Sequence, residues 1–163
     1  MTTRTYQYDF ESSIGYWITM TSHCYQQTLN DELAPFGITF RQFQVLAWLA
    51  YDGELSQTEL ARRMMIEPPT LVGILDRMQR EGWIERTLCP DDRRRKRLAL
   101  RAAAEPVWLK VVSCLNRVRQ RATSGMSDKE VAMLKKLLGK VQDNLSEHLP
   151  PNAETQHAGA ATL

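Results

Sequence analysis

Apolar side chains recur at every third or fourth position over much of the chain, which is the spacing of one face of an α-helix. This pattern predicts long helices over residues 10–33, 40–51, 103–123 and 127–147. The last of them carries its apolar side chains at helical spacing: Val131, Leu134, Leu138, Val141 and Leu145. Pro35 and Gly37 end the first helix, because neither residue type favours a helix interior.

Two shorter helices are expected in the middle of the chain. The motifs T-F-R-Q (39–42), S-Q-T-E (56–59) and S-D-K-E (127–130) are capping boxes, in which a hydroxyl and an acid or amide side chain exchange hydrogen bonds with the backbone. The second box opens a short helix that ends near residue 64. Another helix begins at Pro68 and Pro69, which suit a first turn, and ends before Gly82. Its buried stripe is Leu71, Leu75 and Met78.

Residues 83–88 and 96–101 change to an alternation of apolar and polar side chains, which is the period of a β-strand. With a polar turn between them they predict a β-hairpin. The expected fold class is therefore mainly α with a small β-hairpin (α+β). Its central part is a helix-turn-helix followed by a hairpin, or wing.

Composition restricts the class of protein. The chain has 163 residues, 43% of them hydrophobic and 25% charged, as expected for one globular domain. No apolar run is long enough to cross a membrane and the N-terminus lacks a signal peptide, so we expect a cytoplasmic protein with no membrane partner. Three widely spaced cysteines predict no disulfide framework and no metal site. Because the sequence contains no phosphate-binding loop and no catalytic motif, we expect no cofactor and no enzyme activity.

Positive charge is concentrated in the predicted winged region. Residues 56–101 carry a net charge of +4, whereas the whole chain carries +2. Five consecutive cations, residues 93–97, begin in the turn of the hairpin and continue into its second strand. Such a turn can be merely solvated, but after a helix-turn-helix it favours double-stranded DNA as the partner. The helix before it would present Pro69, Thr70, Gly73 and Arg77 to solvent, with Arg77 and Arg80 reaching phosphates.

The segment I-E-P-P-T-L-V-G-I-L-D-R-M-Q-R-E-G-W-I-E-R, followed by D-D-R-R-R-K-R-L-A-L, resembles the MarR family of bacterial transcription regulators, especially its SlyA-like branch. The resemblance implies a homodimer that binds a palindromic, often A·T-rich operator and releases it on binding a small phenolic or anionic ligand. In the family's D-x-R motif the arginine enters the minor groove and the aspartate orients it. Here these are Asp92 and Arg94, beside Arg93 and Arg95.

The resemblance also implies a domain organisation. A single MarR-type domain would span residues 1–148, with dimerisation helices over 10–37 and 103–148 around a winged helix-turn-helix over 38–102. Residues 149–163 would form a disordered tail. Two departures stand out, since many relatives carry a basic residue where this chain has Gly73, and a capping threonine where it has Arg101.

A ligand cleft is expected between the dimerisation helices and the DNA-binding part. His23, Phe43 and Ala47 match cleft positions of the SlyA-like branch. Aromatic residues concentrate in the first two helices, where they would either line this cleft or simply pack in the core. The arginine that some relatives use for phenolic acids is absent.

Three alternatives remain open on the sequence. Gly73 is compatible with a winged protein–protein interaction module that has lost specific DNA reading. A nucleoid-like protein with broad sequence preference is a second possibility. A redox-sensing regulator is the third, since Cys24 lies in the first helix and Cys89 lies beside the cationic turn.

Overall fold

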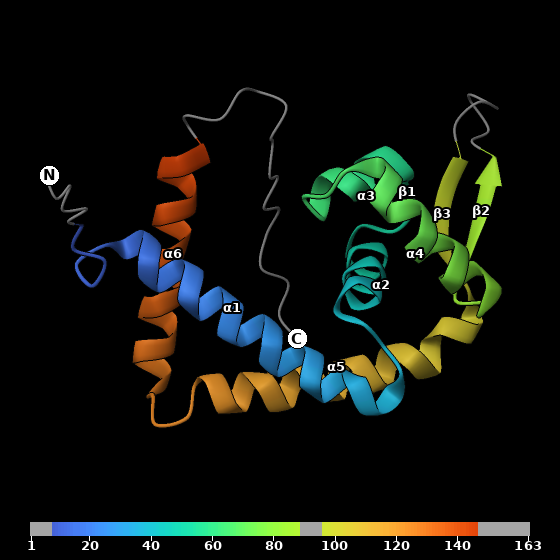
Figure 1. Cartoon of the computed structure of the whole chain (residues 1–163). Coiled ribbons are helices and arrows are strands. Elements are labelled where there is room, and N and C mark those ends of the chain that lie inside the picture. Colours follow the sequence, from blue (N-terminus) through green and yellow to red (C-terminus); the bar gives the residue numbers. More distant parts are fainter. Residues whose placement is uncertain (1–7, 89–95, 147–163) are drawn as a thin grey trace, which may run out of the picture. The chain divides into compact units, whose positions relative to one another are not determined.

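The structure is a computed structural model that describes residues 8–88 and 96–146. The chain forms two compact units, Met1–Ala122 and Thr123–Leu163. In the first unit the order is α1 (Ile14–Leu33), the 3-10 helix η1 (Ala34–Phe36), α2 (Phe40–Asp52), β1 (Leu55–Ser56), α3 (Gln57–Arg63), α4 (Pro68–Arg80), β2 (Ile84–Leu88), β3 (Lys96–Leu100), the 3-10 helix η2 (Ala102–Ala104) and α5 (Glu105–Ala122) (Figure 1). The described part of the second unit holds α6 (Asp128–Ser146). The predicted fold class, mainly helical with a small hairpin, is confirmed.

All three predicted capping boxes are present. The Thr39 backbone N–H donates to Gln42 Oε1 at 2.9 Å, and the Gln42 backbone N–H donates to Thr39 Oγ1 at 3.2 Å. The same reciprocal pairs join Ser56 to Glu59 and Ser127 to Glu130. They satisfy backbone groups that a helix start would otherwise leave unpaired, and they fix where α2, α3 and α6 begin.

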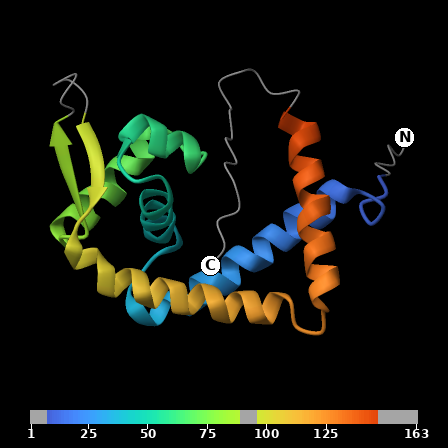
Figure 2. The ribbon, with the colours of Figure 1, turned by 180° about the vertical axis from the view of Figure 1, so that it is seen from behind.

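The long helix α5 begins two residues later than its apolar pattern suggests. Arg101, which replaces the expected capping threonine, makes no side-chain cap. Instead the Ala104 backbone N–H donates to the Arg101 carbonyl at 2.8 Å, so a turn of 3-10 helix, η2, precedes α5. Figure 2 shows β3 leading through this turn into α5.

The sheet has one more strand than the alternation predicts. β2 and β3 pair antiparallel as expected, with Arg86 opposite Leu98 and Ile84 opposite Leu100. The two-residue strand β1 adds to the other edge of β3, with Leu55 opposite Leu98, which gives the order β1-β3-β2. A strand of two residues is too short to show any period, so the sequence pattern could not reveal it.

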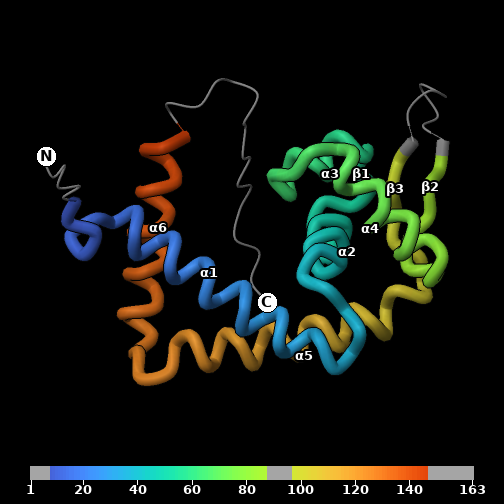
Figure 3. The backbone as a smooth tube through the Cα atoms, in the orientation of Figure 1, coloured from blue at the N-terminus to red at the C-terminus, as the bar shows by residue number. Residues whose placement is uncertain are grey.

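The core of the first unit is closed by the apolar stripe of α4. Leu71, Leu75 and Met78 are completely buried, as their spacing predicts. They pack in one cluster with buried side chains from α2, α3 and the sheet, among them Leu46, Leu60, Ile84 and Leu98. Figure 3 shows α2 in the middle of this unit, with α3 and α4 on one side and α5 on the other.

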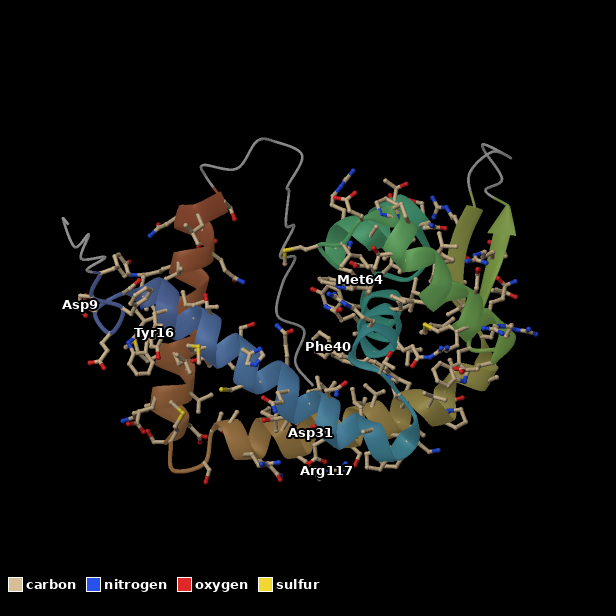
Figure 4. All side chains as sticks on the ribbon, in the orientation of Figure 1. Asp9, Tyr16, Asp31, Phe40, Met64 and Arg117 are labelled. Atoms are coloured by element: carbon tan, nitrogen blue, oxygen red, sulfur yellow. The ribbon has the colours of Figure 1, made fainter. Side chains whose placement is uncertain are left out.

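The C-terminal half of α1 packs on α5, where Leu29, Leu33, Val111 and Val118 are buried. Glu32 and Arg117 join the two helices by an ion pair with 2.7 Å between Oε2 and Nε (Arg117 is labelled in Figure 4). The N-terminal half of α1 is different, because it leaves large apolar side chains exposed: Ile14, Tyr16, Trp17 and Met20. Its predicted start at residue 10 is also too early, since Ser13 is extended and the helix begins after it.

The helix α6, taken by itself, has no buried residue between Asp128 and Ser146. Its apolar side chains therefore lie in solvent, including Leu134, Leu137, Leu138 and Leu145. Within the described residues, no helix combines the length and the apolar character that spanning a bilayer requires.

The Ser56–Glu59 box gives a pH-dependent contribution to stability. Hydrogen bonds from the Ser56 side chain and backbone hold the pKa of the Glu59 carboxyl below its ordinary value of 4.5. The unfolded chain therefore binds more protons near this pH, so the stabilisation is present above pH 4.5 and is lost as the pH falls through the lower folded pKa. We expect Glu59→Gln to be less stable than the wild type by a few tenths of a kcal/mol at pH 7, because this carboxylate is largely solvated.

Urea unfolding of both proteins at pH 7 and near pH 4 measures the difference between their free energies of unfolding. The other carboxylates are the same in both proteins, so their titration cancels in this difference. The stability gap should shrink on acidification. A gap that stays constant or widens would show that the Glu59 charge does not stabilise α3.

Gly73 offers a second stability prediction. It lies inside α4, and a Cβ atom built there would meet nothing within 4 Å. Gly73→Ala should raise the free energy of unfolding by about 0.5–1 kcal/mol, since alanine loses less backbone entropy in a helix. Gly82→Ala is the matched control and should destabilise the protein, because Gly82 has a φ of +76°. Thermal or urea unfolding measures both changes in stability. A destabilising effect of Gly73→Ala would contradict the observation that a Cβ atom at this position meets no other atom.

Candidate DNA-binding surface

The start of α4 is set by its two prolines. Glu67 has an extended backbone, with φ −68° and ψ 139°, as expected for a residue before proline. Pro68 and Pro69 fit the first turn because they have no N–H to leave unpaired. The helix begins without a side-chain cap, and the Thr70 backbone N–H donates to the Glu67 carbonyl at 3.0 Å.

The face of α4 opposite the buried stripe is exposed to solvent. It carries all five α4 residues that the sequence suggested for DNA contact: Pro69, Thr70, Gly73, Arg77 and Arg80. Their exposure and common face are as predicted, and their contact with DNA stays a prediction. The sequence interpretation missed Val72, whose 41% exposure is high for a β-branched apolar side chain in a helix. The sequence did not single out Val72, because it is an apolar residue directly next to buried Leu71. The two side chains differ only in the direction in which the helix turns them.

The hairpin places the predicted cationic turn. β2 runs away from α5 and ends at Leu88, and β3 begins at Lys96 and runs back toward α5 (Figure 1). Asp92, Arg93, Arg94 and Arg95 lie outside the described residues. What the structure gives is therefore the base from which that turn is presented, next to α4.

The hairpin base is joined to α4 by a polar contact that the sequence did not reveal. Arg86 Nη1 of β2 lies 2.7 Å from Asp76 Oδ1 and donates to Gln79 Oε1 at 2.8 Å. The next acidic residue along the chain, Glu81, is also hydrogen-bonded, since Gln42 Nε2 donates to Glu81 Oε2 at 3.5 Å. No local pattern signals the Asp76–Arg86 pair, because its members belong to different elements.

The ligand-site candidates lie on two helices. Phe43 and Ala47 are half-buried on α2, one helical turn apart, whereas His23 is exposed on α1. Phe43 packs against Phe40 with ring centroids 5.6 Å apart. None of these contacts identifies a ligand, so the three residues remain a prediction.

The aromatic residues of the first two helices fall into more than one group. Ring contacts among the described residues fall into separate groups near the start of α1, at Phe40–Phe43 and at Trp48–Tyr51. Tyr16, Trp17, Tyr25 and Phe36 are exposed, so core packing does not account for them.

The cysteines differ in their surroundings. Cys24 is exposed, whereas Cys114 is buried and its thiol donates to the Glu32 carbonyl at 3.2 Å. Cys89 lies outside the described residues. Across residues 8–88 and 96–146, no group of three or more His, Cys, Asp and Glu side chains is placed to hold a metal ion.

Comparison with known proteins agrees with this architecture. A model of the MarR family matches residues 36–95, which run from the end of η1 through the winged helix-turn-helix. The crystal structure of apo MarR from E. coli is 28% identical with a TM-score of 0.72, and the match covers 79% of this chain and 96% of that chain.

Two further structures extend the comparison. A cysteine-to-serine mutant of E. coli MarR, solved in complex with operator DNA, is 29% identical with a TM-score of 0.70, over 78% of this chain and 92% of that one. BpsR of Bordetella bronchiseptica, whose DNA binding is regulated by 6-hydroxynicotinic acid, is 20% identical with a TM-score of 0.73, over 84% and 98%. At that identity BpsR supports the fold alone. The MarR family model thus matches the winged part of this chain, and the fold over most of the chain is similar to that of E. coli MarR.

Proposed function

We propose that this protein is a sequence-specific, DNA-binding transcription regulator that acts as a homodimer on a palindromic operator. The observation that carries the proposal is the division of α4 into two faces. Its apolar stripe is completely buried, and its opposite face presents a hydroxyl and two arginines beside a hairpin whose turn and second strand carry five consecutive cations. A solved complex of E. coli MarR with operator DNA supports the same use of the fold. Such a regulator acts in the bacterial cytoplasm.

The exposed residues of α4 suit distinct tasks. Thr70, in the first turn, can donate to or accept from a base edge in the major groove. Arg77 and Arg80, in the last turn, are placed to neutralise phosphates and so to fix the register of the helix on the duplex. Pro69 and Gly73 offer no side-chain hydrogen bond, so they bring the helix close to the groove without selecting a base through one.

The cationic turn supplies the second contact. Arg94 enters the minor groove, and Asp92 orients its guanidinium by a charge-assisted hydrogen bond. Arg93 and Arg95 contact phosphates on either side. Narrow A·T-rich minor grooves have an enhanced negative potential, which favours an operator with A·T pairs at this position.

The homodimer covers the exposed apolar surfaces. The N-terminal half of α1 leaves Trp17 55% exposed, and Leu145 of α6 is 62% exposed. Apolar side chains gathered along whole helices mark an interaction surface, and a second copy is the partner that requires nothing beyond this chain. A two-fold dimer also presents two α4 helices to successive turns of the major groove, and so calls for a palindromic site.

A small phenolic or anionic ligand would release the DNA. We propose His23, Phe43 and Ala47 as residues that face it, following the SlyA-like branch to which we assign the chain. Phe43 and Ala47 share one side of α2, and His23 supplies an imidazole that can hydrogen-bond to a ligand. A ligand that binds one arrangement of the two α4 helices better than another shifts the population away from the DNA-binding state.

Selection from random duplexes by the purified protein tests the function. We expect a two-fold symmetric consensus that is bound at least about a thousandfold more tightly than random DNA, which is the usual margin of specific binding. No enrichment, together with affinity that collapses as salt rises, would contradict operator recognition. That result would favour a nucleoid-like role or a winged module for a protein partner.

The variant Arg94→Ala tests the hairpin contact. Loss of one minor-groove arginine should weaken binding to the selected duplex by about 1–3 kcal/mol. Fluorescence anisotropy measures the affinity, and Lys129→Ala, which removes one exposed cation from α6, is the control of equal charge. Equal affinities of the Arg94→Ala protein and the wild type would disprove the role of the hairpin.

A further inference from the structure

The structure assigns Asp76 as a positioning residue that sets, through Arg86, the placement of the hairpin relative to α4. This inference rests on the proposed function, because it concerns how two DNA-contacting elements are held for simultaneous binding. The contact consists of one guanidinium of β2 and two acceptors of α4. Arg86 Nη1 lies 2.7 Å from Asp76 Oδ1 and donates to Gln79 Oε1 at 2.8 Å.

The two acceptors belong together on the helix. Asp76 and Gln79 are three residues apart, so they are neighbours on the side of α4 that faces β2. The Arg86 side chain is only 20% exposed, whereas that of Asp76 is 51% exposed. Arg86 is thus directed at α4 with its charge compensated, which makes it a strut between the elements instead of a phosphate ligand.

The place of Arg86 in the sheet explains why a strut matters there. Arg86 lies opposite Leu98 of β3, and Leu98 in turn lies opposite Leu55 of β1. β1 ends one residue further on, at Ser56, which pairs with Arg97. Beyond this level the hairpin consists of two strands only, and an isolated two-stranded hairpin is marginally stable.

The hairpin is therefore held from both sides where its free part begins. β1 supports the edge of β3, and the Asp76–Gln79 pair supports β2. A helix in the major groove and a turn in the minor groove strengthen each other only if their spacing fits the duplex, since the second contact forms at a high effective concentration when the geometry is right. Loss of the strut should reduce the benefit of the hairpin contact.

Charge alone predicts the opposite result for Asp76→Asn. A half-exposed carboxylate on a helix that faces DNA repels phosphates, so its neutralisation should tighten binding. A positioning role predicts weaker binding in spite of the added net positive charge. The direction of the change therefore separates the two explanations.

Affinity of the full-length chain for the selected duplex, measured by anisotropy, provides the test. We expect Asp76→Asn to bind about three- to tenfold more weakly than the wild type, and Asp76→Glu to recover part of the loss. Glu85→Gln is the matched control. It neutralises a carboxylate one residue from Arg86. The Glu85 carboxylate forms a looser ion pair with Arg101, with 3.9 Å between Oε2 and Nε, and this pair does not involve α4. Its affinity should stay within twofold of the wild type.

A double-mutant cycle with Arg94→Ala separates positioning from a general loss of structure. If Asp76 acts by placing the hairpin, Asp76→Asn should weaken DNA affinity by less than about twofold in a protein that already carries Arg94→Ala. Gln79→Ala removes one acceptor without a change of charge and should weaken binding two- to threefold. It decides the matter if thermal unfolding shows that Asp76→Asn does not fold.

Several results would overturn the inference. Binding by Asp76→Asn that is equal to or tighter than that of the wild type would do so, as would an equal cost with and without Arg94. A loss in Glu85→Gln as large as that in Asp76→Asn would point to charge or stability in place of position. Failure of the wild type to bind any selected duplex would instead remove the proposed function, and this inference with it.

Discussion

The burial of Leu71, Leu75 and Met78 is the constraint on which the rest of the molecule depends. Each of these side chains is removed completely from water, and burial of one such side chain contributes about 1.5–3 kcal/mol. Because the stripe must face the core, the rotation of α4 about its own axis is fixed. Its polar face is then turned to solvent, and β2 follows directly along its side. The chemistry of the exposed face is thus a consequence of packing on the opposite face.

Local signals in the sequence were sufficient for most of the fold. Apolar period, reciprocal capping pairs and the prolines at the start of α4 each act within a few residues, and they predicted the helices, the hairpin and the exposed face of α4. Signals that depend on distant residues were missed. β1 forms by pairing with β3, and the burial of the polar Gln42 side chain is tolerated because it caps α2 and also reaches Glu81. The turn between α3 and α4 likewise holds Met65 at a φ of +51°, which its residue type would not suggest.

The same distinction applies to the candidate site. Residues on one helix could be assigned to a common face from spacing alone, so Thr70, Arg77 and Arg80 were found together. The contact between Asp76 of α4 and Arg86 of β2 joins residues ten positions apart in the sequence, and no period or motif encodes it. The ligand-binding residues were the hardest to predict from sequence, because a cleft between helices depends on their tertiary placement. The apolar side chains of α6 are exposed for a related reason, since nothing within the unit that the helix forms covers them.

Hydroxyl-radical footprinting of the protein, alone and bound to a selected duplex, tests the central claim most directly. Oxidation of each exposed side chain, read by mass spectrometry, shows which surface DNA covers. The account predicts that oxidation of Pro69 and Val72 on α4 falls in the complex, while that of Leu109, which is 64% exposed on α5, stays unchanged. Protection of Leu109 with no change on α4 would contradict the assignment of α4 as the helix that reads DNA.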